Sequence, residues 1–211
     1  MHAAPRLGPT AAACAAVLLL FAAALWSLTR GFQAWTFDEA RRLQARAGER
    51  SAAPLTLLGA GGPHAAPWGL PTAAPAVTLV DFIYTRCPGV CQALGSEYEQ
   101  MQRELAPGGA VRLLSISIDP AHDGPAELSA YAARHHADPA RWTLGVPNSD
   151  AALQGLLRSL GVVAVPDGTG GFVHNGAIHL IDARGRLRGL HGHAEWREAL
   201  AAAQAQVQTP R

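Results

Sequence analysis

Hydrophobic positions fall along this chain in two arrangements: one long apolar segment near the N-terminus, then short apolar runs separated by polar turns. No charged side chain occurs between Arg6 and Arg30, and residues 10–29 would span roughly 30 Å as a helix at ~1.5 Å per residue. The pattern predicts a transmembrane helix or signal anchor over 10–29, preceded by an N-terminal tail, 1–9. Small residues at 22–24 leave open a cleaved signal peptide. Both interpretations send the rest of the chain out of the cytoplasm.

Beyond residue 50, apolar runs typical of strands alternate with amphipathic runs typical of helices. Residues 76–84 (AVTLVDFIY) are almost continuously apolar, as in a strand that is buried on both faces. Helix boundaries are indicated by Pro125 at the start of one segment and by Gly161 at the end of another. Strands are predicted at 76–84, at 111–119 and on both sides of a turn in 177–191, a loop at 161–173, and helices at 92–106, 124–136, 148–162 and 194–206.

This order of elements predicts an α/β fold. Strands that alternate with helices pair in parallel through crossover connections, whereas the final hairpin must add antiparallel strands at one edge. The order is that of a thioredoxin-like domain, which we expect over 52–207. The linker 30–51 contains a short amphipathic helix, and residues 51–76, rich in Pro, Gly and Ala, are predicted to be irregular or to form short hairpins.

Composition agrees with a globular domain and excludes some functions. The 211 residues are 49% hydrophobic and 16% charged, with a formal net charge of +1. Recognition of nucleic acid requires a clustered basic face, and the arginines here are scattered. We therefore expect no nucleic-acid partner.

Two of the three cysteines form a candidate reactive pair. Cys87 and Cys91 follow the predicted strand 76–84, and Pro88 suits the first helical position, so both thiols are expected on the opening turn of a helix. The helix N-terminus, together with Arg86, would favour the thiolate form. A structural disulfide is the alternative, but so short a loop would contribute little stability. Cys14, inside the apolar segment, is interpreted as a small hydrophobic residue.

The spacing of the two cysteines favours a soft metal ion over redox chemistry alone. Three residues separate the thiols, one more than in a C-x-x-C redox motif, and thiolates select Cu(I), zinc or iron–sulfur clusters. A structural zinc site needs four ligands, and no second cysteine pair is present to supply them. Two sulfurs and one imidazole suit copper better.

One of the nine histidines is the candidate third ligand. His174 lies just before the penultimate strand, in a loop that a thioredoxin-like fold places beside the cysteines. His191 and His193 form an H-x-H pair that could bind metal by itself. The others are assigned to the surface, to solvated helix ends or loops, or, for the strand residue, to packing: His2 and His64; His122, His135 and His136; and His179.

Three ordered motifs resemble the Sco/SenC family of membrane-anchored, copper-binding, thioredoxin-like proteins that assist assembly of cytochrome c oxidase. The motifs are DFIYTRCPGVC, LLSISIDPAHDGPAELSAY and VHNGAIHLIDARGRL. The resemblance implies that Cys87, Cys91 and His174 bind Cu(I) or Cu(II). It also implies a membrane anchor and a partner that bears the copper A centre or otherwise accepts copper. The apolar segment starts near residue 10 and leaves little room for a mitochondrial presequence, so we expect a bacterial inner membrane with the domain in the periplasm. Val173 and Gln92 depart from the acidic residue and the proline that are common in the family.

Two enzyme functions remain as alternatives. An exported thiol:disulfide oxidoreductase would use one cysteine to attack and the other to resolve, and would not need His174. A thiol peroxidase follows from fold analogy alone. All of these functions, copper binding included, require a thiol reductant in the oxidising exported compartment, because a Cys87–Cys91 disulfide blocks thiolate chemistry.

Overall fold

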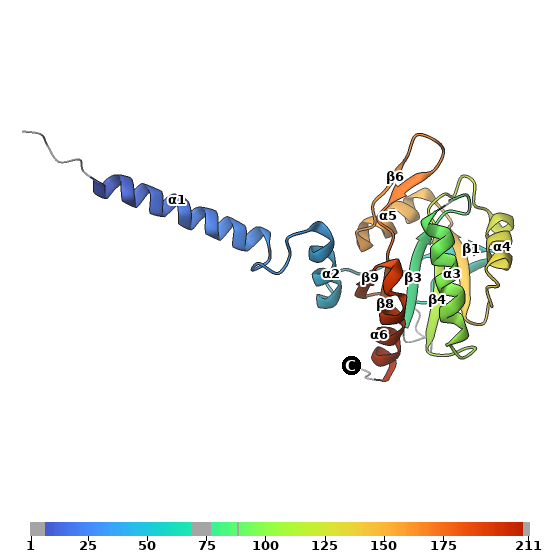
Figure 1. Cartoon of the computed structure of the whole chain (residues 1–211). Helices are drawn as coiled ribbons and strands as arrows, with labels where there is room; N and C mark the ends of the chain where they lie inside the picture. Colours follow the sequence, from blue (N-terminus) through green and yellow to red (C-terminus); the bar gives the residue numbers. More distant parts are fainter. Residues whose placement is uncertain (1–6, 69–76, 88, 209–211) are drawn as a thin grey trace, which may run out of the picture. The chain divides into compact units, whose positions relative to one another are not determined.

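The computed structural model describes residues 7–68, 77–87 and 89–208. The chain divides into two compact units, residues 1–43 and 44–211. In the first unit, helix α1 (Leu7–Leu28) contains 21 residues, Gly8–Leu28, that are apolar enough to cross a membrane (Figure 1). Helix α2 (Phe37–Ala47) begins in this unit and carries acidic residues in its first turn and a basic residue in its last, as the helix dipole favours.

The second unit contains one large sheet, one small sheet and four further α-helices within the described residues. Its strands are β1 (Thr56–Gly59), β2 (Gly62–Ala65), β3 (Val77–Ile83), β4 (Val111–Ser117), β5 (Trp142–Pro147), β6 (Ala164–Pro166), β7 (Phe172–His174), β8 (Ile178–Asp182) and β9 (Leu187–His191). Its helices are α3 (Val90–Arg103), α4 (Pro125–Arg134), α5 (Asp150–Leu160), the short 3₁₀ helix η1 (His193–Glu195) and α6 (Trp196–Gln208).

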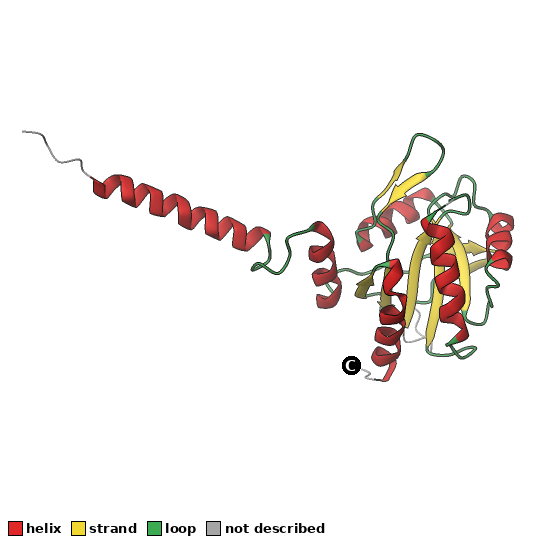
Figure 2. Ribbon diagram, in the orientation of Figure 1, coloured by secondary structure: helices red, strands yellow, loops and turns green. Residues whose placement is uncertain are grey.

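The large sheet has the strand order β2-β1-β5-β4-β3-β8-β9. Figure 2 shows its strands in yellow, with helices in red beside them. Strands β3, β4 and β5 are parallel, whereas β8 pairs antiparallel with β3 and β9 pairs antiparallel with β8. This confirms the predicted parallel core with an antiparallel hairpin at one edge. Helices α3 and α6 contact each other and both contact β3, and α5 contacts β5.

Burial explains why β3 was easy to recognise in the sequence. It lies between β4 and β8, and all seven of its residues are buried. A strand in that position must be apolar on both faces. The predicted boundaries, 76–84, differ from the observed ones by one residue at each end.

Strand β5 was not predicted. Its sequence, WTLGVP, contains a glycine and ends in a proline, both of which are unfavourable in strands. Gly145 is needed here because a Cβ at this position would lie 2.8 Å from Leu57 Cβ on the neighbouring strand β1. Close approach of two strands thus accounts for a residue that weakened the strand signal.

The predicted loop at 161–173 is wrong in part. Strands β6 and β7 pair in this segment as a separate antiparallel hairpin, with Val165 opposite Val173. The two strands are only three residues long and flank a glycine-rich turn, so their alternation was too short to identify. Val163, Val165 and Val173 are exposed on this hairpin.

One residue of β3 does not fit its apolar surroundings. Asp81 is completely buried, and neither carboxylate oxygen has a hydrogen-bond partner among the described residues. Burial raises the pKa of Asp81 to about 7. Around neutral pH the core must therefore hold either a buried proton or an uncompensated charge.

We predict that Asp81→Asn stabilises the protein above neutral pH. The folded-state pKa of Asp81 exceeds its unfolded value, so the folded state holds a proton that the unfolded state has lost. Wild-type stability should fall as pH rises toward about 7, by up to ~1.4 kcal/mol per pH unit from this group, and then level off. The neutral isostere removes that loss.

Urea unfolding of the wild type and of Asp81→Asn, at pH values below and above about 7, tests the prediction. The stability advantage of Asp81→Asn should be largest at pH values above the folded-state pKa and shrink as the pH falls. An advantage that is absent, or the same at every pH, would show that Asp81 is not a buried titrating group.

Candidate functional site

The two candidate thiols lie where the chain leaves β3 and enters α3. Cys91 is in the first turn of α3, whereas Cys87 lies in the preceding turn, where its amide donates to the carbonyl of Tyr84 at 3.1 Å. Because α3 begins at Val90, the expectation that both thiols share the opening helical turn is wrong for Cys87; Pro88 lies outside the described residues. Both side chains are buried, and neither forms a disulfide within the described part of the chain.

The pKa values of the two thiols are shifted in opposite directions. Burial alone would raise the pKa of Cys87, but hydrogen bonds from the Cys91 thiol, from the backbone amides of Cys91 and Gly89 and from the Tyr84 hydroxyl together lower it below its ordinary value. Burial raises the pKa of Cys91, and the hydrogen bond that its thiol donates to Cys87 raises it further. The structure therefore favours a thiolate on Cys87 and a protonated thiol on Cys91.

The amides at the start of α3 supply the stabilisation that was expected from a helix N-terminus. Arg86, the other expected source, is engaged elsewhere: its guanidinium lies 2.8 Å from the Asp119 carboxylate. It also donates to the carbonyl of Gly170, at the tip of the β6–β7 hairpin, at 3.1 Å. Arg86 therefore ties the turn 84–87, called the thiol turn below, to that hairpin.

His174 is brought to the thiols by the same hairpin. It is the last residue of β7, and its Nε2 lies 3.9 Å from Cys91 Sγ, although 83 residues separate the two in sequence. Burial lowers the pKa of His174, which favours the neutral imidazole that can bind a metal. The other ring nitrogen, Nδ1, is buried and has no hydrogen-bond partner among the described residues.

Tyr84 is a second residue that connects the thiol turn with the hairpin. Its hydroxyl donates to the carbonyl of Phe172 at 3.4 Å, and its ring packs edge-on against Phe172 at 5.5 Å and against His174 at 6.5 Å. The same hydroxyl also lies beside the Cys87 thiol and helps to lower its pKa. Sequence reasoning missed Tyr84, whose one signal was a hydroxyl-bearing ring at the end of an apolar run.

The three predicted ligands lie close together but do not form a finished metal site. Cys87 and Cys91 are hydrogen-bonded, and Cys91 contacts His174. Within residues 7–68, 77–87 and 89–208, however, no group of three or more His, Cys, Asp or Glu side chains has the geometry to hold a metal ion. The donors thus form two overlapping pairs that share Cys91, and a small movement would be needed to close them on one ion.

A buried polar network holds the thiol turn through Thr85. Asp123 is fully buried and accepts hydrogen bonds from the Thr85 amide at 2.9 Å, the Thr85 hydroxyl at 2.6 Å and the Ser117 hydroxyl at 2.6 Å. Asp119 pairs with His122 and Arg86; burial opposes its charge, but these two partners lower its pKa overall. This network involves Asp119, His122 and Asp123 of the second motif, of which only His122 had been assigned from the sequence, as a solvated residue.

A second contact fixes the first turn of α3. The hydroxyl of Tyr131, on α4, donates to the backbone carbonyl of Cys91 at 2.6 Å, and both groups are buried. The prediction that His135 is solvated is wrong, because its ring packs against Tyr131 with a centroid distance of 4.5 Å and is buried. A Cβ at Gly95 would lie 2.5 Å from that ring, so helix α3 comes too close for His135 to face solvent.

The remaining histidines do not join the site. His122 and His136 are exposed, as expected, and His179 is buried edge-on against Phe82, which confirms the packing role. His193 lies 3.3 Å from Glu97, away from the thiols. His64 is half-buried near the Gly62 carbonyl, and His191 is half-buried at the end of β9. His2 lies outside the described residues.

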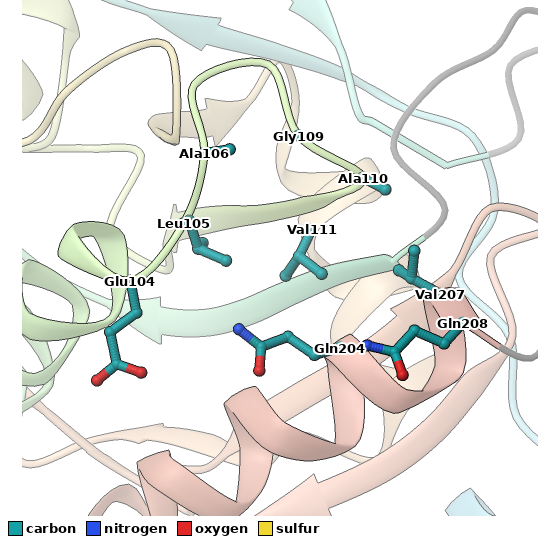
Figure 3. A pocket seen from close by; sticks show the side chains of 9 residues that line it. All are labelled: Glu104, Leu105, Ala106, Gly109, Ala110, Val111, Gln204, Val207 and Gln208. Carbon is teal, nitrogen blue, oxygen red and sulfur yellow. The ribbon is translucent and has the colours of Figure 1, made fainter.

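A pocket on the second unit lies at the other end of the sheet from the thiols. It has a volume of about 420 Å³ and is lined by the end of α3, the start of β4 and the last turns of α6 (Figure 3). The thiols follow the carboxyl end of β3, whereas this pocket includes Val111, at the amino end of the parallel strand β4. Its lining contains no cysteine or histidine, so it is not the candidate site.

We predict that Asp123→Asn destabilises the thiol turn. The two carboxylate oxygens of Asp123 accept three hydrogen bonds, whereas the amide of asparagine has only one acceptor oxygen. At least one of the three donors therefore loses its partner. Urea unfolding at neutral pH should show a loss of about 1–3 kcal/mol. The matched control Asp150→Asn, in the exposed first turn of α5, should cost less than about 1 kcal/mol. Equal losses in the two variants would contradict a supporting role for Asp123.

Comparison with known proteins identifies the family of this chain. Residues 72–208 match the SCO1/SenC family. A SCO1 protein homologue from Bacillus subtilis is 28% identical over 114 residues, which cover 53% of this chain and 59% of that protein. The chain thus spans less than two thirds of the length of this curated relative.

Solved structures agree with this result. ScoI of Bradyrhizobium japonicum, solved with copper bound, is 26% identical, with a TM-score of 0.56 over 74% of this chain and 98% of that one. BsSco, a member of the Sco family of cytochrome c oxidase assembly proteins in which a disulfide switch was identified, has a TM-score of 0.64 at 20% identity, covering 76% of this chain and 95% of that one. These similarities confirm the predicted thioredoxin-like fold. The chain belongs to the SCO1/SenC family.

Proposed function

We propose that this chain is a membrane-anchored copper chaperone in which Cys87, Cys91 and His174 bind one copper ion for delivery to another protein. The observation that carries the proposal is the contact of 3.9 Å between Cys91 Sγ and His174 Nε2, beside a buried pair of thiols. Family membership supports it, since the related ScoI of Bradyrhizobium japonicum was solved with copper bound.

The chemistry of the three side chains suits copper in either oxidation state. Thiolates are soft donors that favour Cu(I), and a neutral imidazole also binds Cu(II). Hydrogen bonds already favour the thiolate on Cys87, and burial keeps His174 neutral. Copper binding would displace the proton that burial and the hydrogen bond to Cys87 hold on the Cys91 thiol.

Incomplete closure of the site is consistent with a cargo ion. A chaperone must release copper as well as bind it, and the described residues do not form a rigid, finished metal cage. His174 reaches the thiols from a short hairpin, which the Tyr84 and Arg86 contacts hold against the thiol turn. Movement of this hairpin would open the site without disturbing the large sheet.

The recipient we propose is the copper A-bearing subunit of cytochrome c oxidase or another copper-accepting protein. BsSco belongs to a family of oxidase assembly proteins, and this chain shares that family. Helix α1 would anchor the chain in the bacterial inner membrane as a single span, with the copper-binding domain, residues 52–207, in the periplasm. Exposed valines on the β6–β7 hairpin leave apolar surface beside His174, where a partner would have to approach.

A thiol:disulfide oxidoreductase is the second candidate, and the unequal acidity of the thiols favours it. The Cys87 thiolate would attack a partner disulfide, forming a mixed disulfide and releasing one partner thiol. Cys91, after losing its proton, would then attack Cys87 Sγ, releasing the second partner thiol and leaving a Cys87–Cys91 disulfide. An external thiol reductant would restore the pair. This reaction does not use His174.

Copper titration of the reduced full-length protein in detergent, without oxygen, separates the two candidates. We predict about one tightly held copper per chain, and at least ~100-fold weaker binding in His174→Ala and Cys87→Ala, because loss of an outer-shell partner alone costs roughly 10–100-fold. The control His136→Ala changes an exposed histidine just after α4, whose partner is Glu99, and should bind as wild type. Weak copper binding by the wild type, with disulfide exchange that is insensitive to His174→Ala, would favour the oxidoreductase.

We also predict that oxidation of the thiol pair abolishes copper binding and that reduction restores it, because a disulfide removes both thiolates. Copper uptake is measured before oxidation, after it and after treatment with a thiol reductant. Cys14→Ala serves as the control and should behave as wild type, since Cys14 lies in α1. Unchanged uptake by the oxidised protein would place the ligands elsewhere, with His191 and His193 the next candidates.

A further inference from the structure

The segment between α1 and α2 was predicted to be linker, but the structure shows an ordered turn. The hydroxyl of Thr29 donates to the carbonyl of Leu25 at 2.6 Å and accepts from the amide of Phe32 at 2.9 Å. The amides of Gln33 and Ala34 both donate to the Thr29 carbonyl, at 3.0 Å and 2.9 Å. Thr29 and Ala34 are buried inside this turn.

The backbone of the turn has positive φ angles at three successive residues, of which two are not glycine. Arg30, Gly31 and Phe32 have positive φ angles of 51°, 73° and 62°. For a residue other than glycine this conformation costs on the order of 1–3 kcal/mol, and it persists where the surroundings enforce it, often for a functional reason. A passive linker would not need it.

The effect of the turn is to gather aromatic rings on its surface. Phe32 packs edge-on against Trp26 at 5.5 Å and stacks on Trp35 at 5.8 Å. Even so, the aromatic side chains remain largely exposed to solvent: 61% for Trp26, 45% for Phe32, 66% for Trp35 and 67% for Phe37. In water, this much exposed aromatic surface is unfavourable, so an apolar or interfacial environment would stabilise it.

The residues on either side indicate which environment that is. On one side lies α1, an apolar helix whose 21 membrane-compatible residues are not buried within the structure. On the other, α2 begins with charged groups: Glu39 accepts from the amides of Trp35 and Thr36 at 2.8 Å and 2.9 Å, and Asp38 pairs with Arg42 at 2.9 Å. The order apolar, aromatic, charged is the order of hydrocarbon, headgroup region and water in a bilayer.

We propose that residues 26–37 form an interfacial anchor whose aromatic rings lie in the headgroup region of the lipid bilayer at the end of α1. The ligand is the lipid surface itself, because the rings continue directly from a helix that requires lipid around it. The proposal rests on the membrane anchoring proposed above, and adds that the turn, as well as the helix, contacts lipid. Tryptophan is suited to this depth, since its ring is apolar and its N–H can bond to water or headgroups.

Lipid quenching of tryptophan fluorescence tests the proposal in the full-length protein. The protein is reconstituted in phosphatidylcholine vesicles that contain lipid brominated either near the headgroup or near the end of the acyl chain. Three of the five tryptophans, Trp68, Trp142 and Trp196, are buried in the second unit, so the quenchable emission should come from Trp26 and Trp35. We expect stronger quenching by lipid brominated near the headgroup, and Trp35→Phe should roughly halve the quenched emission.

The control Trp196→Phe should leave the quenched emission unchanged, because that ring is buried on α6. If Trp35→Phe also leaves it unchanged while Trp26→Phe abolishes it, the turn lies in water and the proposal is wrong, although α1 remains an anchor. If lipid quenches neither Trp26 nor Trp35, the membrane anchoring fails as well. Copper titration of the same samples is independent of all these results and tests the ligand proposal separately.

Discussion

The ladder of hydrogen bonds between β3 and β8 is the constraint on which the candidate site depends. These strands are antiparallel, with Val80 opposite His179 and Val77 opposite Asp182. The carboxyl end of β3 and the amino end of β8 therefore lie next to each other, at the same end of the sheet. Cys87 and Cys91 follow the first strand closely, and His174 precedes the second, so the topology alone brings two thiols and an imidazole together. The Tyr84, Arg86 and Asp123 contacts then refine a proximity that the sheet has already established.

Much of this arrangement could be predicted from the sequence, and the failures have physical causes. Apolar runs identified β3 and β4, and the two cysteines with His174 were recognised by residue chemistry and by resemblance to a family. Strand β5 was not predicted because Gly145, which is required for close packing against Leu57, weakened the strand pattern of its sequence. The β6–β7 hairpin was too short to show alternation. Tyr84, Asp123 and Tyr131 act through contacts with residues distant in sequence, which periodicity does not reveal.

The electrostatics of the site link copper binding with thiol chemistry. One set of hydrogen bonds lowers the pKa of Cys87, and burial raises that of Cys91. Unequal thiols suit stepwise disulfide exchange, whereas a metal ion removes the difference by binding both sulfurs as thiolates. What distinguishes a copper site from a redox pair here is the third side chain, since His174 has no part in disulfide exchange but supplies the nitrogen that a copper ion would bind. Its contact with Cys91 is therefore central to the account.

X-ray absorption at the copper edge of the reduced, copper-loaded protein tests this claim most directly, because it identifies the atoms bound to the metal. The account predicts two sulfur ligands and one imidazole nitrogen in the wild type, and loss of the imidazole contribution in His174→Ala with both sulfurs retained. A spectrum with sulfur ligands alone, or an imidazole contribution that persists in His174→Ala, would contradict the assignment of His174 as the third ligand.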